Sequence, residues 1–190
     1  MSDKMKTRYP RAEALKVAAE LCQALKPACD RLIVAGSLRR GKLDVGDVEI
    51  LYIPKFEDRK IDLLTVEPVN LAECVIADLL LSGTLLKRPS KSGSFSWGAK
   101  NKLAIHSLGG IPVDLFASTE SNWFNYLVCR TGPSESNIRI ASAAKAKGWQ
   151  WNPYSSGFTR DDHCEAYLVT REKDVFDFVS LPYYEPRHRR

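Results

Sequence analysis

The run GSLRRGKLDVGDVEILYIP, residues 36–54, constrains the fold of this chain more than any other stretch. Apolar residues at 32–35 predict a strand that enters the Gly-Ser turn, and the turn continues as one helical turn. Residues 47–53 predict a second strand, in which Asp47 and Glu49 share one face while Val48 and Ile50 share the other. We therefore expect a sheet whose apolar face is covered by helices.

The remaining pattern extends this to strands packed on helices, an α/β or α+β fold with a mixed sheet and flanking helices. Helices are predicted at 12–26 and 71–81, and further strands at 61–66, 84–87, 102–106 and 112–117. After residue 118 the character changes to helices at 122–130 and 133–147, short aromatic strands, and a last helix near 172–180. We expect two domains, residues 1–118 and a small α+β lobe at residues 119–190.

Composition excludes several classes of protein. The chain of 190 residues is 44% hydrophobic, which is enough to build a core, and its longest apolar run, 75–81, is too short to span a bilayer. We expect a soluble, cytoplasmic protein without a membrane partner. The five cysteines are scattered and never form a CxxC pair, so neither disulfides nor a zinc site is indicated. The DDHC run at 161–164 is interpreted as a surface loop.

The turn at Gly36 and Ser37 is a candidate anion site. A strand that leads into such a turn presents backbone N–H groups and a hydroxyl at a helix start, where the helix dipole favours negative charge. Arg39 and Arg40 add charge-assisted donors. Turns of this kind also occur simply as helix caps, so the turn alone leaves both interpretations open.

The carboxylates favour the phosphate interpretation. Asp47 and Glu49 on one strand face repel one another unless a cation lies nearby, and magnesium prefers oxygen ligands and bridges to phosphates. An acidic edge facing solvent is the alternative. Asp114 lies in the apolar strand GIPVDLFAS, where a carboxylate is costly to bury without a partner. Three such carboxylates beside a phosphate site are what two-metal nucleotidyl transfer requires.

A basic stretch precedes Asp114. No acidic residue lies between Asp78 and Asp114, and the interval carries five basic residues, Lys87, Arg88, Lys91, Lys100 and Lys102, with Phe95 and Trp97 interleaved. This composition suits contact with a nucleic-acid backbone. A solvated surface with no partner would give the same pattern.

At this point the sequence resembles the family X DNA polymerases, the DNA polymerase beta group of the nucleotidyltransferases. GSLRRGKLDVGDVE is similar to the family's Gly-Ser-x-Arg-Arg-Gly…Gly-Asp-x-Asp motif, and VDLF supplies the third acid. The resemblance implies that Asp47, Glu49 and Asp114 are catalytic and bind two Mg²⁺ ions, with Mn²⁺ as a substitute. It also assigns nucleotide-binding residues: triphosphate contacts at Gly36, Ser37, Arg40 and Gly46.

The resemblance continues to the C-terminus. Thr131 and Gly132 correspond to the turn beside the sugar of the incoming nucleotide, and the helix SNIRIASAAKAKGW is similar to the one that checks the nascent base pair. There Arg139 matches the template-side contact and Asn137 the residue that touches the incoming base. The segment EKDVFDFVSLPYYEPRHRR resembles the family's C-terminal signature.

The sequence departs from the family pattern at three points. Glu49 stands where the family has Asp, and Cys129-Arg130 replaces the aromatic pair that disfavours a ribose hydroxyl. Neither a lyase domain nor helix-hairpin-helix motifs are expected. What remains resembles a palm with a nucleotide-selecting, thumb-like lobe, as in the very small viral members of the family, and we expect a monomer.

Three functional hypotheses follow. The first is a template-directed DNA polymerase that adds dNMP from a dNTP to a primer 3′ hydroxyl, at short gaps in DNA repair, with primer-template or gapped DNA as its partner. The second is a template-independent nucleotidyltransferase acting on an RNA end or a small hydroxyl compound. The third is a nucleic-acid-binding module that has lost catalysis. The base-checking helix and the C-terminal signature favour the first, and the presence of all three acids disfavours the third.

Overall fold

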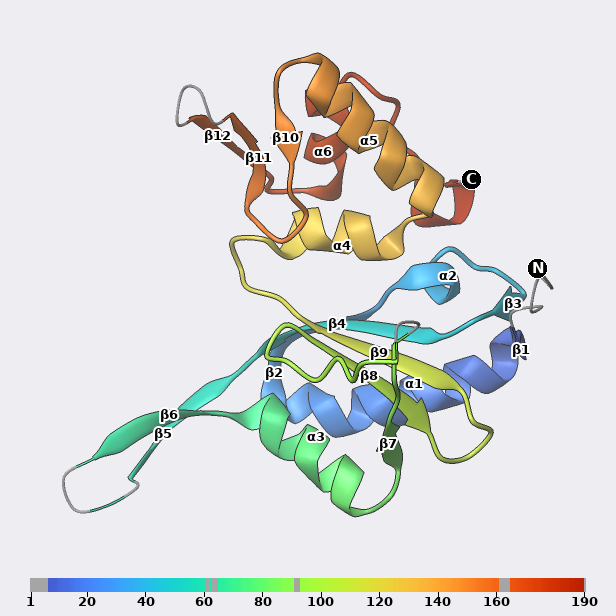
Figure 1. The fold of residues 1–190 in the computed structure, drawn as a ribbon, viewed down its shortest axis with the longest axis vertical. Coiled ribbons are helices and arrows are strands. Elements are labelled where there is room, and N and C mark those ends of the chain that lie inside the picture. The colour runs from blue at the N-terminus through green and yellow to red at the C-terminus, as the bar shows by residue number, and fades with distance from the viewer. Residues whose placement is uncertain (1–6, 61, 63–64, 91–92, 161–164, 190) are drawn as a thin grey trace. The chain divides into compact units, whose positions relative to one another are not determined.

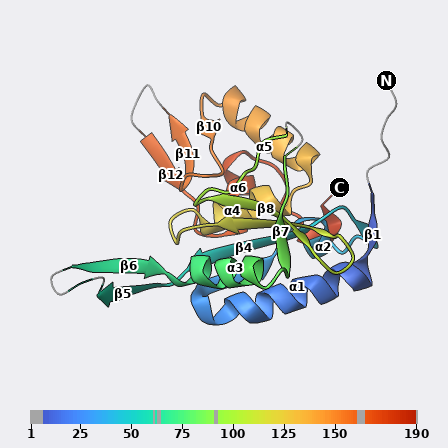
Figure 2. The ribbon, with the colours of Figure 1, turned by 60° about the horizontal axis from the view of Figure 1, so that its bottom comes forward.

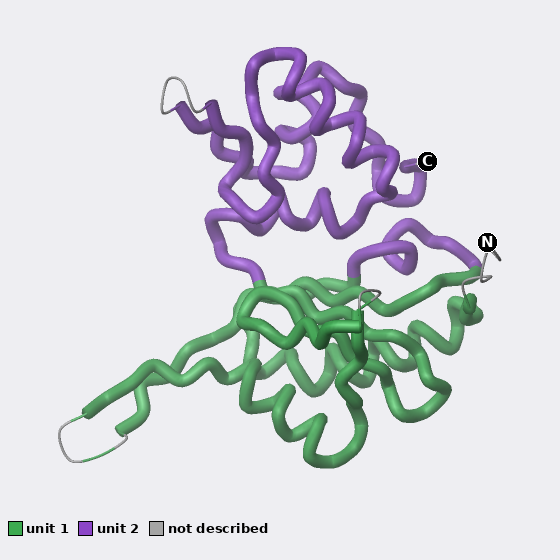
Figure 3. The backbone as a smooth tube through the Cα atoms, in the orientation of Figure 1, with its two compact units in different colours: residues 1–34, 44–117 green, residues 35–43, 118–190 purple. Residues whose placement is uncertain are grey.

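The computed structural model describes residues 7–60, 62, 65–90, 93–160 and 165–189 (Figure 1). It has the mixed α+β character that the sequence predicts. The chain forms two compact units, which are described one at a time. Residues 1–34 and 44–117 form the first unit, and residues 35–43 and 118–190 form the second (Figure 3).

A five-stranded mixed sheet is the centre of the first unit. Its order is β2-β4-β9-β8-β7, with β4 and β9 parallel and the other neighbours antiparallel. The strand bounds are β2 Cys29–Val34, β4 Val48–Pro54, β7 Leu85–Lys87, β8 Asn101–His106 and β9 Pro112–Ala117. Along β4, Ile50 and Leu51 are fully buried, so this strand is covered on both faces. The sheet therefore holds the acidic residues of β4 and β9 on a rigid support.

Two helices lie on the same side of this sheet, as Figure 2 shows. Helix α1 (Arg11–Leu25) packs against β2, β4 and helix α3 (Leu71–Leu81). The buried face of α1 repeats at helical spacing through Ala14, Val17, Leu21 and Leu25, as the sequence pattern predicts. The 3₁₀ turn η1 (Lys26–Ala28) follows α1 at Pro27. Asn70 caps α3 by accepting a hydrogen bond from the backbone N–H of Glu73 at 3.1 Å.

Two short antiparallel pairs complete the first unit. Strand β1 (Tyr9–Pro10) pairs with β3 (Asp44–Val45), and β5 (Phe56–Lys60) pairs with β6 (Val66–Asn70) in a ribbon that extends away from the sheet (Figure 1). Of the described residues in the predicted strand at 61–66, Val66 alone lies in a strand, because β5 ends at Lys60 and β6 begins at Val66. Every residue of β5 is exposed, so β5 lacks the half-buried alternation on which strand prediction depends.

The second unit combines helices with a small sheet. Its helices are α2 (Gly36–Arg39), α4 (Trp123–Thr131), α5 (Ser134–Ala146) and α6 (Glu172–Phe178), and its C-terminal segment contains the 3₁₀ turn η2 (Pro186–His188). An antiparallel sheet is formed by β10 (Gln150–Trp151), β11 (Gly157–Arg160) and β12 (Glu165–Leu168). Residues 35–43 belong to this unit, although the sequence interpretation placed them in the first domain.

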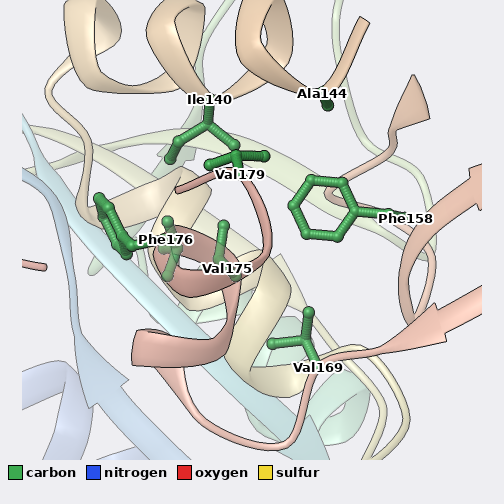
Figure 4. Packing of buried hydrophobic residues seen from close by; sticks show 8 residues of the cluster. Ile140, Ala144, Phe158, Val169, Val175, Phe176 and Val179 are labelled. Carbon is green, nitrogen blue, oxygen red and sulfur yellow. The ribbon is translucent and has the colours of Figure 1, made fainter. Parts of the chain in front are cut away.

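An apolar core joins the helices of the second unit to its sheet (Figure 4). Its buried members are Val128, Ile140, Ala144, Phe158, Val169, Val175, Phe176 and Val179. The ring of Phe158 stacks on that of Phe178, with centroids 4.2 Å apart. This core fixes α5, which carries Asn137 and Arg139, relative to α6, which carries Glu172.

Candidate active-site residues

The acidic residues of the first unit lie on and just before β4. The structure begins β4 at Val48, one residue later than predicted, so Asp47 immediately precedes the strand. Val48 and Ile50 are fully buried, whereas Asp47 and Glu49 are half-buried. The alternation in burial agrees with the prediction that the two carboxylate-bearing residues share the side opposite Val48 and Ile50. Gly46, between β3 and β4, is buried.

The parallel pairing of β4 with β9 brings the third acid beside the second. Glu49 and Asp114 are register partners, so they occupy neighbouring positions on adjacent strands. Asp114 is half-buried, and Arg88, which follows β7, donates a hydrogen bond and forms an ion pair to its Oδ1. The Nε of Arg88 also donates to the carbonyl of Ala104 at 3.3 Å. The guanidinium thus balances the charge of Asp114 within the sheet.

The donor chemistry of this acidic group fits a hard divalent cation, since carboxylate oxygens are the ligands that Mg²⁺ prefers. As the side chains lie, however, no group of three or more His, Cys, Asp or Glu residues in the described part of the chain is arranged to hold a metal. The ion pair with Arg88 occupies one oxygen of Asp114. A cation that uses this oxygen therefore has to displace the guanidinium.

In the second unit, α2 forms the Gly-Ser turn that the sequence predicts. Gly36 has φ of +61°, a conformation that glycine adopts without steric cost, and Leu38 anchors the turn with 2% of its surface exposed. The Oγ of Ser37 is buried and has no hydrogen-bond partner among the described residues. A buried hydroxyl without a partner is costly, so this atom is suited to a ligand oxygen.

Arg40 connects α2 to the end of α4. Its Nη1 donates to the carbonyl oxygen of Thr131. A Cβ atom at Gly132, which has φ of +61°, would lie 3.2 Å from the same Nη1. Only a residue without a side chain fits there comfortably, so Arg40, Thr131 and Gly132 form one tightly packed group. All three were expected to bind nucleotide, and the structure brings them together.

Arg39 holds α2 against α6 through a buried carboxylate. Its Nη1 donates to the Oγ1 of Thr131 at 2.6 Å, and both terminal nitrogens donate to Glu172. The Nη2 of Arg189 donates at 2.7 Å to Oε2 of Glu172, the oxygen that also accepts from Nη1 of Arg39. Burial by itself would raise the pKa of Glu172, but hydrogen bonds and charge from Arg39, and then from Arg189, lower it below its ordinary value. The carboxylate is therefore held ionised between two guanidinium groups.

The two candidate base-contacting residues lie on α5. Asn137 is half-buried, and its Nδ2 donates to the carbonyl of Cys129 at 2.8 Å, so its amide ties α5 to α4. Its Oδ1 is buried with no partner among the described residues. Arg139 is exposed and lines a cavity in the second unit. Of the two, Arg139 is the more exposed.

The structure corrects the prediction that all five residues of the basic stretch contact nucleic acid. Lys102 is 2% exposed, forms an ion pair with Glu73, and donates to the carbonyl of Gly98 at 2.9 Å, so it cannot contact a nucleic-acid backbone. Lys87 and Lys100 are exposed, and the Nζ of Lys87 lies 5.0 Å from the ring centroid of Trp97. Lys91 lies outside the described residues, as does the DDHC run at 161–164 that is predicted to be a loop.

Sequence reasoning missed the partners that hold these groups in place. Arg88 was counted only as one member of a basic stretch, and Glu172 was not singled out. Each pairs with a residue distant in sequence, Asp114 and Arg39 respectively. No local spacing signals such a pair. The one available hint was the cost of burying Asp114 in an apolar strand, which required some partner.

The geometry agrees with comparisons with known proteins. Residues 126–190 match the family model for the DNA polymerase beta thumb. The chain is 26% identical over 202 residues to DNA polymerase lambda of Arabidopsis thaliana, a match that covers 98% of this chain and 37% of that protein. It also resembles polymerase beta of Leishmania infantum, solved as a ternary P/T complex, with 19% identity and a TM-score of 0.74 over 97% of this chain and 77% of that chain.

The structural similarity defines the fold class: this is a polymerase beta-like α+β fold. Taken together, the three matches show a chain that is similar to polymerases beta and lambda and whose C-terminal part matches the polymerase beta thumb. The chain spans 37% of the length of the polymerase lambda that it matches. None of the helices in the described residues combines the length and apolar composition that a bilayer crossing needs.

Proposed function

We propose that this protein is a template-directed DNA polymerase that adds a dNMP from a dNTP to a primer 3′ hydroxyl. The observation that carries the proposal is the register pairing of Glu49 with Asp114, with Asp47 two residues earlier on the same side. Within a fold of the polymerase beta class, this acidic group is the natural site of phosphoryl chemistry. We further propose that the substrate is a short gap and that the protein works as a monomer in DNA repair.

Asp47, Glu49 and Asp114 would hold Mg²⁺, or Mn²⁺ in its place. When bound, such ions stabilise the negative charge that develops on phosphate oxygens and lower the pKa of an attacking hydroxyl. Asp114 would orient the primer 3′ hydroxyl and draw its proton. Arg88 would keep the carboxylate in place before the ion arrives. Glu49 reaches one methylene further than Asp, which suits a slightly different ion position.

The second unit would supply the nucleotide contacts. The Oγ of Ser37 would donate to a phosphate oxygen of the dNTP, which would satisfy a hydroxyl that is otherwise buried without a partner. Arg40 would add charge to the same phosphates while its contact with Thr131 fixes the turn. Gly36, Gly46 and Gly132 would allow close approach of the backbone. Asn137 and Arg139 would face the nascent base pair.

The experiment that tests this function is primer extension with a labelled primer on three substrates: a one-nucleotide gap, an open template and no template. We expect addition of the templated nucleotide, fastest at the gap. Equal addition on all three substrates would replace the proposal with template-independent nucleotidyl transfer. If the protein binds the gapped DNA but adds no nucleotide to any of the three substrates, it would be a nucleic-acid-binding module without catalytic activity.

The division into domains is part of the proposal. We propose residues 1–118 as a palm and residues 119–190 as a thumb-like domain. Residues 35–43 would be the part of the palm segment whose packing lies in the second compact unit. The proposed dNTP-binding turn at residues 35–43 would thus lie within the palm segment of the sequence but pack with the thumb-like domain.

A further inference from the structure

A groove of about 470 Å³ lies in the second unit, where the C-terminal end of α5 leads into β10. We call it the α5–β10 groove, and its lining residues are Ala141, Lys145, Gly148, Trp149 and Gln150. Pockets that take small ligands measure about 300–1,000 Å³, so this groove has room for one nucleotide. None of its lining residues is among the nucleotide contacts proposed above.

Two lining residues of the groove are small. Ala141 on α5 and Gly148 beyond the end of this helix are both exposed. Gly148 has φ of +76°, a conformation that favours glycine, and a Cβ atom at this position would meet no other atom within 4 Å. The backbone N–H of Gly148 donates to the carbonyl of Lys145 at 3.0 Å, which closes the turn. The space above the turn is therefore open, while the turn itself is fixed.

Trp149 gives the groove an aromatic surface. It is half-buried and packs against the apolar core of the second unit. Its ring lies nearly perpendicular to that of Phe178, with centroids 5.1 Å apart, and Phe178 in turn stacks on the buried Phe158. These contacts hold the indole in place. A fixed aromatic ring in a groove suits the stacking of a nucleic-acid base, which tolerates any base sequence.

The chain around the groove is basic. No Asp or Glu lies between Glu135 and Asp161, whereas this interval carries four basic residues, Arg139, Lys145, Lys147 and Arg160. Lys145 is exposed and lines the groove itself, while the Nζ of Lys147 donates to the carbonyl of Phe178 at 2.7 Å. A backbone phosphate at the groove would meet the ammonium group of Lys145 without a carboxylate in the same stretch of chain.

Helix α5 connects the groove with the residues that are proposed to face the nascent base pair. Asn137 and Arg139 flank Ile138, which is 65% exposed. Ile138, Ala141 and Lys145 follow one another at helical spacing, so they share one stripe of α5. The seven residues from Ile138 to Lys145 rise about 10 Å, which equals about three steps of a B-form strand. A strand that leaves the nascent base pair along this stripe would reach the groove within a few nucleotides.

We propose that the α5–β10 groove binds an unpaired nucleotide of the template strand, a few positions ahead of the templating base. The base would stack on Trp149, and the phosphate would lie at Lys145. An unpaired base has faces available for stacking, and a single strand bends readily into a groove. This inference rests on the proposed function, because only a templated reaction supplies such a strand. The protein would therefore favour a template that extends beyond the templating base.

The first test measures the affinity for a labelled primer-template whose template overhang is lengthened from one nucleotide to five. We expect the affinity of the wild type to rise by roughly tenfold, equal to about 1.4 kcal/mol, once the overhang enters the groove. Ala141→Leu, which fills the groove at an exposed helical position, and Lys145→Ala should both lose this rise. Ala146→Leu on α5 and Lys173→Ala on α6 change exposed residues outside the groove and are the matched controls.

The second test replaces one base of the overhang at a time by an abasic site, which removes stacking and keeps the phosphate. We expect a single position to weaken binding by the wild type, and no position to matter for Ala141→Leu. The inference is wrong if overhang length has no effect on the wild type, or if Ala141→Leu and Lys145→Ala match the wild type at every length. It is also wrong if Lys145→Ala weakens binding equally at all lengths, because Lys145 would then contact the duplex.

Asp47→Asn separates this inference from the proposed function. The variant should keep the preference for the longer overhang while losing nucleotide addition, because Asp47 is not among the lining residues of the groove. A wild type that adds templated nucleotides without any overhang preference would contradict the groove alone. A wild type that prefers the overhang and adds no nucleotide would contradict the proposed polymerase activity alone.

Discussion

Arg88 forms an ion pair with Asp114, the acid that is the register partner of Glu49 on the neighbouring strand. A Mg²⁺ ion that uses the same oxygen of Asp114 would have to replace this pair. We expect Arg88→Ala to lower the Mg²⁺ concentration for half-maximal nucleotide addition by roughly threefold to tenfold. This effect is smaller than the about 1.5–3 kcal/mol of a charged hydrogen bond would give, because the ion pair is partly exposed.

A magnesium titration of single-turnover gap filling measures this effect. Arg88→Lys, which keeps the charge, should stay near the wild type, and Arg59→Ala on the exposed ribbon is the control for loss of an arginine. If Arg88→Ala requires more magnesium, the arginine supports the metal-bound state, and the competition described above does not exist.

Removal of a single metal-binding carboxylate should abolish the chemistry without unfolding the protein. We expect Asp47→Asn or Asp114→Asn to lower the rate of nucleotide addition by roughly a thousandfold or more, because a neutral amide is a poor substitute for a charged ligand. Asp58→Asn on the exposed strand β5 is the matched control. The measurement is single-turnover addition at saturating DNA. A rate within about tenfold of the wild type would contradict the assignment of these acids.

Ser37→Ala should separate folding from nucleotide binding. Because the Ser37 hydroxyl is buried without a partner among the described residues, its loss should leave the free energy of unfolding unchanged or slightly higher. The apparent dNTP affinity should fall roughly threefold to tenfold, the equivalent of one hydrogen bond. Denaturant unfolding and dNTP titration at saturating DNA measure the two quantities. A destabilised variant with normal dNTP affinity would show that the hydroxyl serves the fold.

Glu172 should make stability depend on pH in the acid range. Its pKa in the folded protein lies below the ordinary value of 4.5, so the unfolded chain takes up a proton first as the pH falls. The stabilisation by ionised Glu172 is therefore complete above that value and is lost as the pH drops through the lower folded pKa. Glu172→Gln should cost about 1.5–3 kcal/mol at pH 7, and the difference should shrink below pH 4.5.

Urea unfolding of wild type and variant at pH 7 and in acid tests this prediction. Glu165→Gln on β12, an exposed position, provides the control for loss of a carboxylate. A difference between wild type and Glu172→Gln that is the same at both pH values would mean that the charge of Glu172 contributes nothing to the fold.

The exposed lysines of the basic stretch should bind the DNA backbone. Lys87→Ala and Lys100→Ala should each weaken binding to every DNA sequence alike and reduce the slope of log affinity against log salt by about 0.9 for each phosphate that is no longer neutralised. Lys102→Ala should act differently, because Lys102 is buried and paired with Glu73, so its loss should lower stability. Salt titrations of gapped-DNA binding decide the matter. If the slope of log affinity against log salt is unchanged in both Lys87→Ala and Lys100→Ala, the basic stretch is a solvated surface that does not bind DNA.

Much of the fold could be predicted because its signals are local. Helix α3 and strand β9 have the bounds that the sequence predicts, since a capped apolar run and a short apolar strand each carry their own signal. The ribbon of β5 and β6 escaped prediction because its strands are stabilised by mutual pairing with little burial. Lys102 was misjudged for a related reason: a lysine is expected on the surface, and only the fold reveals that Glu73 pairs with it.

The candidate site, like the fold, was predictable only where its signals are local in sequence. The three acids and the Gly-Ser turn were predicted from spacing and resemblance, and the pairing of Glu49 with Asp114 gives two of them neighbouring positions. The ion pairs of Arg88 with Asp114 and of Arg39 with Glu172 join residues that are remote in sequence. No rule of spacing describes such pairs, because they arise only when the strands and helices have assembled.

The packing of residues 35–43 with the second unit also limits how this protein can be dissected. The chain passes between the two units at 34–35, at 43–44 and again at 117–118, so no single cut releases either unit with all of its packing. A fragment that begins at Ser118 would lack Arg39 and leave Glu172 with one guanidinium instead of two. Isolation of the second unit would require a grafted copy of residues 35–43, joined by a linker, rather than a truncation.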